Sequence, residues 1–301
     1  MYQLKHKRII ALSISLAATM GFSASQANAQ SLVGINSQNQ VGVFDTSNPS
    51  GIAYVNLSGL SSGESFLGID LRPSNNTIYG FTTANKLYTL DAYTGATSFV
   101  ANLATTLFNV SSPKAYGVDF NPVADRGTGA SFRVVSSAGD NYAVNANTGA
   151  VTTATSVAAG YSGVAYANSD PTQPTVAPAS TKLYYLNSNN DSLSVANSSF
   201  NNPSISMIGL IGLDILGANG FELFNDGSAF AAVNVDRGGL KSLLLGIDLV
   251  TGKATELGEF TGTINGLTAA PSAVPVPAAL PLMASAIGFA GLARRKSKFK
   301  V

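Results

Sequence analysis

The sequence predicts an all-β protein, in which a five-bladed β-propeller-like domain is flanked by an N-terminal signal peptide and a C-terminal short transmembrane sorting helix. Three observations predict this: a repeat of about 50 residues, four short strand patterns in each repeat, and one apolar segment near each end of the chain. They divide the chain into residues 1–29, 30–272 and 273–301.

Five segments have alternating apolar residues around a polar turn, the pattern of a β-hairpin. They read SLVGINSQNQVGVFD, TIYGFTTANKLYTLD, SFRVVSSAGDNYAVN, KLYYLNSNNDSLSVA followed by Asn197 and, less cleanly, AFAAVNVDRGGLKSLLLGID. They end at Asp45, Asp91, Asn145, Asn197 and Asp248, at intervals of 46, 54, 52 and 51 residues. Such even spacing predicts a repeat architecture.

Two further elements complete each repeat. A Thr-Gly turn follows three of the hairpins, at Thr94-Gly95, Thr148-Gly149 and Thr251-Gly252. Glycine supplies the positive φ of such a turn, and the Asp or Asn three residues before the threonine can cap its amides. A third strand follows the turn, and a glycine-containing fourth strand comes next: FLGIDLRP, AYGVDFNP, YSGVAYAN, LGANGFELF and INGLTAAP.

Four strands per repeat favour a β-propeller, because each blade needs its neighbours to bury its faces. Five repeats imply five blades. The chain begins with a hairpin and ends with a fourth strand, so we expect INGLTAAP to pair with the first hairpin in one composite blade. This closure would remove exposed sheet edges. A β-sandwich or a two-domain β-protein is the alternative.

Residues 1–29 have the three parts of a secretory signal: a basic start, an apolar run over residues 9–22 and a small polar segment. Ala27 and Ala29 supply the small-x-small pattern that a signal peptidase accepts, which predicts cleavage before Gln30. The alternative is a genuine membrane helix, but the run is shorter than the roughly 20 residues that a span requires.

The C-terminal tail predicts a short membrane helix that is stopped on the cytoplasmic side by a basic cluster. Its parts, in order, are Pro275 and Pro277, the stretch AALPLMASAIGFAGLA, and Arg294, Arg295 and Lys296. This tail closely resembles the PEP-CTERM sorting signal of Gram-negative bacteria, although Val276 stands where that signal has glutamate. The resemblance implies an exosortase as partner, transient inner-membrane anchoring, and then a cell-surface or extracellular location. A plain tail-anchored protein is the alternative.

The central region resembles a second family. The strings GIDLRPSNNTIYGF, LYTLDAYTG, YGVDFNPVADR and FRVVS are similar to an uncharacterised bacterial domain family that PEP-CTERM proteins often carry. The match spans roughly residues 31–271 and is most specific at GVDFNP-x-x-DR followed by RVVS. An insertion at 127–130 lengthens the turn between these two motifs. The resemblance supports the fold and implies no activity.

Composition excludes several classes of function. The chain has no cysteine, and its one histidine, His6, lies in the predicted signal, so the exported domain lacks thiol catalysis, a serine-histidine triad and histidine-ligated zinc. Between Asp45 and Glu259 there are nine basic residues and all 16 acidic ones, a net charge of −7. This charge argues against binding nucleic acid.

Asp70 and Asp119 are the candidate site residues, because they occupy equivalent Gly-apolar-Asp positions. Inner-strand carboxylates could bind calcium or act as an acid/base pair. The interpretation that we adopt is structural, with each carboxylate capping a turn or pairing with Arg72 or Arg126. The reason is that Ala165 and the last repeat break the pattern, which leaves no ring of carboxylates.

These observations predict a non-catalytic surface or extracellular matrix protein, an interaction or structural module with no cofactor. Its expected partners are signal peptidase, an exosortase-type enzyme and extracellular polysaccharide, with membrane contact only through the C-terminal helix. The alternative is a carboxylate-based glycan hydrolase or lyase that uses the propeller channel. That alternative requires Asp70, Asp119 and Glu222 to converge.

Overall fold

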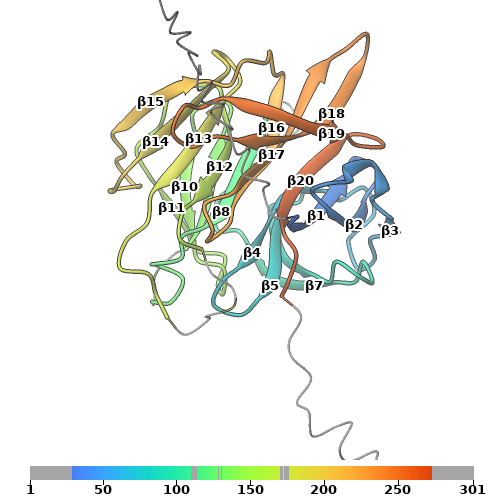
Figure 1. Ribbon diagram of the computed structural model, residues 1–301. Coiled ribbons are helices and arrows are strands. Elements are labelled where there is room, and N and C mark those ends of the chain that lie inside the picture. The colour runs from blue at the N-terminus through green and yellow to red at the C-terminus, as the bar shows by residue number, and fades with distance from the viewer. Residues whose placement is uncertain are drawn as a thin grey trace, which may run out of the picture.

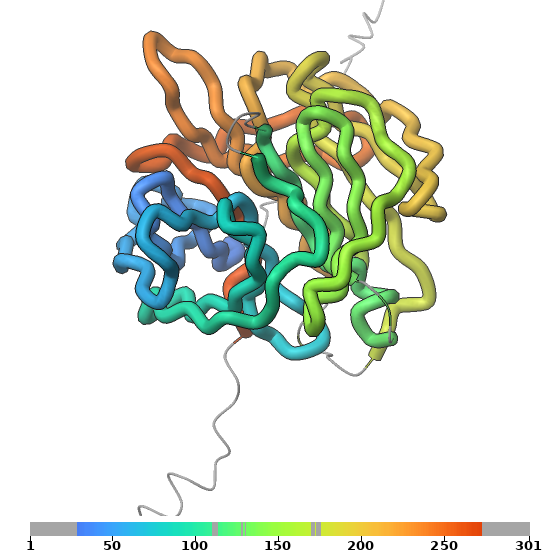
Figure 2. The backbone as a smooth tube through the Cα atoms, turned by 180° about the vertical axis from the view of Figure 1, so that it is seen from behind, coloured from blue at the N-terminus to red at the C-terminus, as the bar shows by residue number. Residues whose placement is uncertain are grey.

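The computed structural model describes residues 29–109, 114–127, 129, 131–169, 172 and 176–272. In these residues the chain forms 20 strands, arranged as five four-stranded antiparallel sheets around a common axis (Figure 1, Figure 2). The prediction of an all-β, five-bladed propeller is confirmed. The predicted sorting helix and all of the predicted signal except Ala29 lie outside the described residues. Within the described part of the chain, no helix is long and apolar enough to span a membrane.

Four blades are continuous segments whose strands follow one another outward from the axis. Blade 2 contains β4 (Phe66–Arg72), β5 (Thr77–Thr82), β6 (Lys86–Leu90) and β7 (Thr97–Asn102). Blade 3 contains β8 (Tyr116–Phe120), β9 (Phe132–Ser136), β10 (Asn141–Val144) and β11 (Val151–Thr153). Blade 4 contains β12 (Tyr161–Tyr166), β13 (Leu183–Asn187), β14 (Ser192–Ala196) and β15 (Ile205–Leu210). Blade 5 contains β16 (Gly217–Leu223), β17 (Ala229–Asp236), β18 (Leu240–Ile247) and β19 (Ala254–Glu259).

Blade 1 is the predicted composite blade. It is built from β20 (Ile264–Ala269), β1 (Ser31–Asn36), β2 (Gln40–Asp45) and β3 (Val55–Asn56), with a short 3₁₀ turn, η1 (Pro49–Gly51), before β3. The last strand lies beside the first in Figure 1, and Leu32 pairs with Ala269. This pairing confirms the predicted closure, so the ends of the described chain join the ring into one unit.

The hydrophobic core is divided among the interfaces between blades. Five clusters of buried residues each join two neighbouring blades; for example, Leu186 of blade 4 belongs to the same cluster as Phe221 of blade 5. Each predicted hairpin forms the two middle strands of a blade, and its alternating apolar residues belong to the clusters between blades. No single blade of the described domain buries its own faces, which is why the repeat needs all five.

The Thr-Gly turns hold one blade against the previous one. Gly95 and Gly149 both have φ of +72°, as the sequence predicted for this turn. The amide of Ser58, after β3, donates to the carbonyl of Gly95, and the amide of Ala104, after β7, donates to that of Gly149. A side chain at either glycine would collide with the backbone of the preceding blade. The motif therefore recurs because it is a contact between blades as well as a turn.

Candidate functional site

The five inner strands share a three-residue pattern of glycine, an apolar residue and a third residue beside the axis. The third positions are Asp70 in β4, Asp119 in β8, Ala165 in β12, Glu222 in β16 and Thr268 in β20. The glycines permit neighbouring inner strands to approach each other. A Cβ on Gly117 would lie 2.8 Å from the Val164 amide nitrogen, and one on Gly220 would lie 2.5 Å from that of Leu267.

Irregular strand pairing helps to aim these third residues. In β4, β12, β16 and β20 the register with the next strand shifts beside the glycine, as between Ala218 and Gly220. A β-bulge of this kind changes which face of the sheet the following side chains point toward. The bulge and the glycine together bring the third residues of different blades to one place on the axis.

Hydrogen bonds link the third residues to the backbone of the next blade. Asp70 Oδ2 accepts from the Phe120 amide at 2.7 Å, and Glu222 Oε2 accepts from the Ala269 amide at 2.8 Å. Thr268 Oγ1 accepts from the Leu71 amide at 2.8 Å, which continues the same pattern across the composite blade.

Each donor amide belongs to the residue that immediately follows the third residue of an inner strand. It points away from the hydrogen bonds that join this strand to the rest of its blade. An inner strand is a sheet edge, so these amides need acceptors from outside their blade. The side chains at the third positions provide those acceptors. We refer to Asp70, Asp119, Glu222 and Thr268 as the axial ring.

The axial ring holds three carboxyl groups in a small buried space. One carboxylate oxygen of each of Asp70, Asp119 and Glu222 lies within 4.8 Å of the others, and the three residues are 4%, 3% and 5% exposed. The Thr268 hydroxyl lies 3.0 Å from Asp70 Oδ1 and 3.1 Å from Glu222 Oε2, so it can donate to either. None of the ion pairs among the described residues includes a member of the ring.

This environment favours protonated carboxyl groups. Burial raises the pKa of Asp70 well above its ordinary value, and the charge of Glu222 raises it further. The pKa of Asp119 is raised by burial and then by Asp70 and Glu222. Burial also raises the pKa of Glu222, although hydrogen bonds from Ala269 and Thr268 oppose the shift. Repulsion among three close carboxylates therefore favours keeping at least one proton in the ring when no cation is bound.

The structure corrects the expected partners of Asp70 and Asp119. We expected each carboxylate to cap a turn or to pair with Arg72 or Arg126, and this expectation is wrong. Arg72 instead pairs with Asp125, with 2.7 Å between Nε and Oδ1. The carboxylates converge with Glu222, whose Gly220-Phe221-Glu222 sequence is a signal for the same axial position that the sequence analysis did not use.

Calcium was the metal considered for Asp70 and Asp119. Three carboxylate oxygens and the Thr268 hydroxyl are hard oxygen ligands of the kind that Ca²⁺ prefers, but Ca²⁺ takes six to eight of them. Asp70 Oδ2 already accepts a hydrogen bond from an amide, and Asp70 Oδ1 lies within hydrogen-bond distance of the Thr268 hydroxyl. The backbone N–H groups that donate to the ring use carboxylate lone pairs as hydrogen-bond acceptors. Fewer lone pairs are then left to bind a cation.

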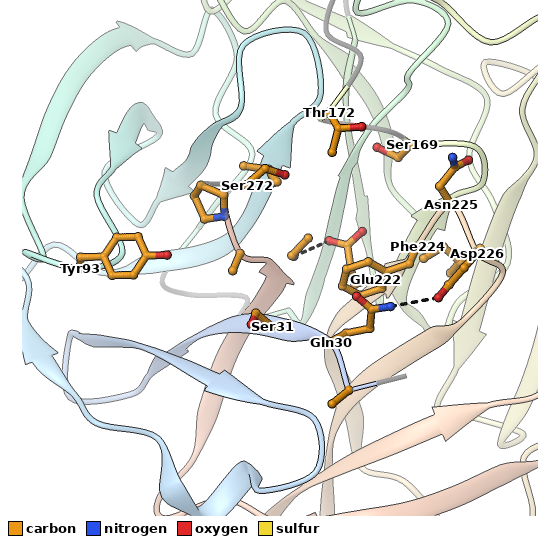
Figure 3. Close-up of a pocket in the computed structure, with 16 residues that line it drawn as sticks. Gln30, Ser31, Tyr93, Ser169, Thr172, Glu222, Phe224, Asn225, Asp226 and Ser272 are labelled. Atoms are coloured by element: carbon orange, nitrogen blue, oxygen red, sulfur yellow. Dashed lines mark hydrogen bonds between the residues drawn. The ribbon is translucent and has the colours of Figure 1, made fainter. Parts of the chain in front are cut away.

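A cavity of about 570 Å³ opens beside the axial ring (Figure 3). Glu222 contributes to its wall, and most of the other polar groups there are neutral amides and hydroxyls, among them Gln30, Asn225 and Ser272. Gln30 donates through its side-chain amide to Asp226 at 3.0 Å. The expected first residue of the exported protein therefore lies at this cavity. The other predicted targeting residues, Ala27, Pro275, Pro277, Arg294, Arg295 and Lys296, lie outside the described residues.

Residues 40–268 match a protein family described as a domain of unknown function, DUF4394. The chain belongs to this family. The match covers most of the chain, from β2 of blade 1 through blades 2 to 5 and into β20. It confirms that the central region belongs to an uncharacterised domain family, as the sequence resemblance indicated. Membership of DUF4394 assigns no activity to the axial ring.

Comparison with solved structures finds distant propellers. They include a candidate 6-phosphogluconolactonase from Bacteroides uniformis (9% identity, TM-score 0.41, covering 77% of this chain and 83% of that one). A calcium-binding regucalcin from Agrobacterium tumefaciens has 12% identity and a TM-score of 0.36, covering 78% and 74% of the two chains. YCF48 bound to D1 peptide has 12% identity and a TM-score of 0.36, covering 76% and 62%. No curated protein matches the sequence.

Proposed function

We propose that this DUF4394 protein is a non-catalytic module of the bacterial surface. It is exported, anchored briefly in the inner membrane by its C-terminal segment, and then displayed or released to contact extracellular polysaccharide. The observation that carries the proposal is the commitment of the axial carboxyl groups to hydrogen bonds between blades. They stabilise the closed ring, and burial keeps Asp70 and Asp119 from substrate.

Accessibility is the main argument against catalysis at the ring. A catalytic acid or base must come within about 3 Å of the proton that it transfers. Asp70 and Asp119 are 4% and 3% exposed, and the closely packed inner strands separate them from solvent. The exported sequence also lacks cysteine and histidine, which supply many nucleophile and base pairs.

One observation favours the glycan hydrolase or lyase as a second candidate. Glu222 lines the cavity of about 570 Å³, and its carboxylate lies within 4.8 Å of two others. Retaining glycosidases place their two carboxyl groups about 5 to 5.5 Å apart. This candidate would use Glu222 as the group that meets substrate, with Asp70 adjusting its pKa.

Glu222→Gln separates the two candidates. We expect the unmodified protein to release no new reducing ends from a panel of bacterial polysaccharides, and the variant to keep any glycan binding. The matched control is Glu64→Gln, since Glu64 is 4% exposed, close to the 5% of Glu222, but lies outside the ring. Turnover by the unmodified protein that falls at least 100-fold in Glu222→Gln, with Glu64→Gln unchanged, would replace our proposal with the enzyme.

The fate of the C-terminal tail tests the sorting part of the proposal. Its apolar stretch of 16 residues would extend about 24 Å as a helix, shorter than a bilayer core of about 30 Å, which suits a transient anchor. We expect mass spectrometry of the native extracellular protein to find Gln30 as the first residue and no peptide from residues 278–296. Recovery of intact peptides through Lys296 would show that the tail is retained.

A further inference from the structure

We propose that a cleft between blades 3 and 4 binds an acidic sugar, and that Arg133 pairs with the sugar's carboxylate. This inference rests on the proposed surface function and names the class of polysaccharide that the protein would contact. Arg133 belongs to the RVVS string that the sequence analysis singled out, and the axial ring does not use it.

Arg133 is a buried cation whose observed partners are all neutral. It is 5% exposed, and its guanidinium donates to the Tyr166 hydroxyl at 3.2 Å, Asn141 Oδ1 at 2.8 Å and Asn201 Oδ1 at 2.9 Å. None of the ion pairs found among the described residues includes it. Burying a charge is costly unless an opposite charge compensates it. A bound anion would supply that charge.

Two comparisons within the molecule strengthen this argument. Arg72 is also largely buried, and the fold gives it the carboxylate of Asp125 at 2.7 Å. Asp119 lies opposite Arg133 in the ladder between β8 and β9, but no ion pair joins the two residues, and the Asp119 carboxyl group lies with those of Asp70 and Glu222. The fold therefore supplies Arg72 with a carboxylate partner, whereas Arg133 donates only to hydroxyl and amide oxygens.

The cleft beside Arg133 has a volume of about 550 Å³. Its walls carry amide and hydroxyl side chains and one aromatic ring: Asn121, Thr152, Ser199, Phe200 and Asn202. Amides and hydroxyls can both donate to and accept from the hydroxyl groups of a sugar. Phe200 is held by an edge-to-face contact with Tyr166, at 4.9 Å between ring centroids, and offers a fixed apolar surface.

The sheet geometry defines one wall of this cleft. Arg133 pairs with Ala143, and Ala143 pairs with Thr152, so the three form a row across β9, β10 and β11. Thr152 is exposed and lines the cleft, whereas the next residue, Thr153, is exposed and does not. Thr152 is thus a position where a new side chain can change the charge of the cleft without entering the core.

Calorimetric titration of the full chain with a galacturonic acid trimer tests the proposal, with its methyl ester as the matched uncharged ligand. We expect saturable binding of the acid and at least tenfold weaker binding of the ester. Thr152→Glu places a carboxylate in the cleft and should weaken binding of the acid at least tenfold, while Thr153→Glu should not. Arg133→Met should also abolish binding, with its melting temperature measured to show that it folds.

Three results would overturn the proposal: equal binding of the acid and its ester, equal losses in Thr152→Glu and Thr153→Glu, or no binding of the acid by the unmodified protein. Tighter binding of inorganic sulfate or phosphate than of the trimer would also overturn the assignment to a sugar. These results leave the surface function standing. Conversely, glycan turnover that depends on Glu222 would refute the surface function without changing the binding measured at Arg133.

Discussion

Truncation of the chain before Ile264 is expected to prevent the domain from folding, whereas truncation after Ser272 is expected to leave its melting temperature unchanged. The first truncation removes β20, the inner strand of the composite blade, together with its whole ladder to β1. Ile264 and Leu267 are buried between blades 5 and 1. Losing even one large buried side chain costs about 2 to 5 kcal/mol, and the whole domain is stable by about 5 to 15 kcal/mol.

Circular dichroism and thermal melting of the two truncated proteins would check this prediction. A peptide of residues 264–272 added to the shorter protein provides a control. Recovery of a cooperative melt would show that loss of β20 alone had prevented folding. A cooperative melt of the shorter protein alone would contradict the prediction. It would mean that the remaining 19 strands close without the composite blade.

The blade number and the closure could be predicted because local signals determine them. Alternating apolar residues indicate each hairpin, and the Thr-Gly turns mark the transition to the third strand. The order of elements at the two ends of the chain then leaves one way to complete blade 1, the composite blade. The Thr-Gly turns also contact the preceding blade. The sequence did not predict this contact, because it depends on how the blades pack against each other.

The convergence of the carboxylates could not be predicted with the same certainty, because it depends on the geometry between blades. When the repeated Gly-apolar-Asp pattern was defined by an acidic third residue, Ala165 and Thr268 were exceptions to it. The relevant property is the ability to accept a hydrogen bond from the next blade, and Thr268 has it. The pairing of Arg72 with Asp125 likewise joins residues of two blades, so sequence separation gave no indication of it.

The axial ring makes the free energy of unfolding depend on pH, and we expect it to fall as the pH rises from about 4 to 8. Asp70, Asp119 and Glu222 have folded-state pKa values raised by burial, the two aspartates also by like charge. In the unfolded chain these groups titrate near pH 3.9 to 4.3. Above that range the folded protein binds more protons than the unfolded one, so a rise in pH favours unfolding.

The expected loss is large because the groups are buried. Each unit by which a folded-state pKa exceeds its unfolded value corresponds to about 1.4 kcal/mol. The stabilisation is complete below the unfolded pKa values and is lost as the pH rises through the folded ones. Exposed turn aspartates act in the opposite sense: the Tyr93 and Thr94 amides lower the pKa of Asp91, so its contribution is lost only as the pH falls below about 4.

Urea unfolding of the unmodified protein and of Asp119→Asn at pH 5 and pH 8 checks this prediction. The variant removes one titrating group and its charge, so its stability should change less between the two pH values, and its stability relative to the unmodified protein should improve at pH 8. Asp91→Asn is the control and should leave the difference between pH 5 and pH 8 unchanged. If the unmodified protein is equally stable at both pH values, or regains its stability at pH 8 only when calcium is added, then the ring carboxylates are ionised around a cation and do not share protons.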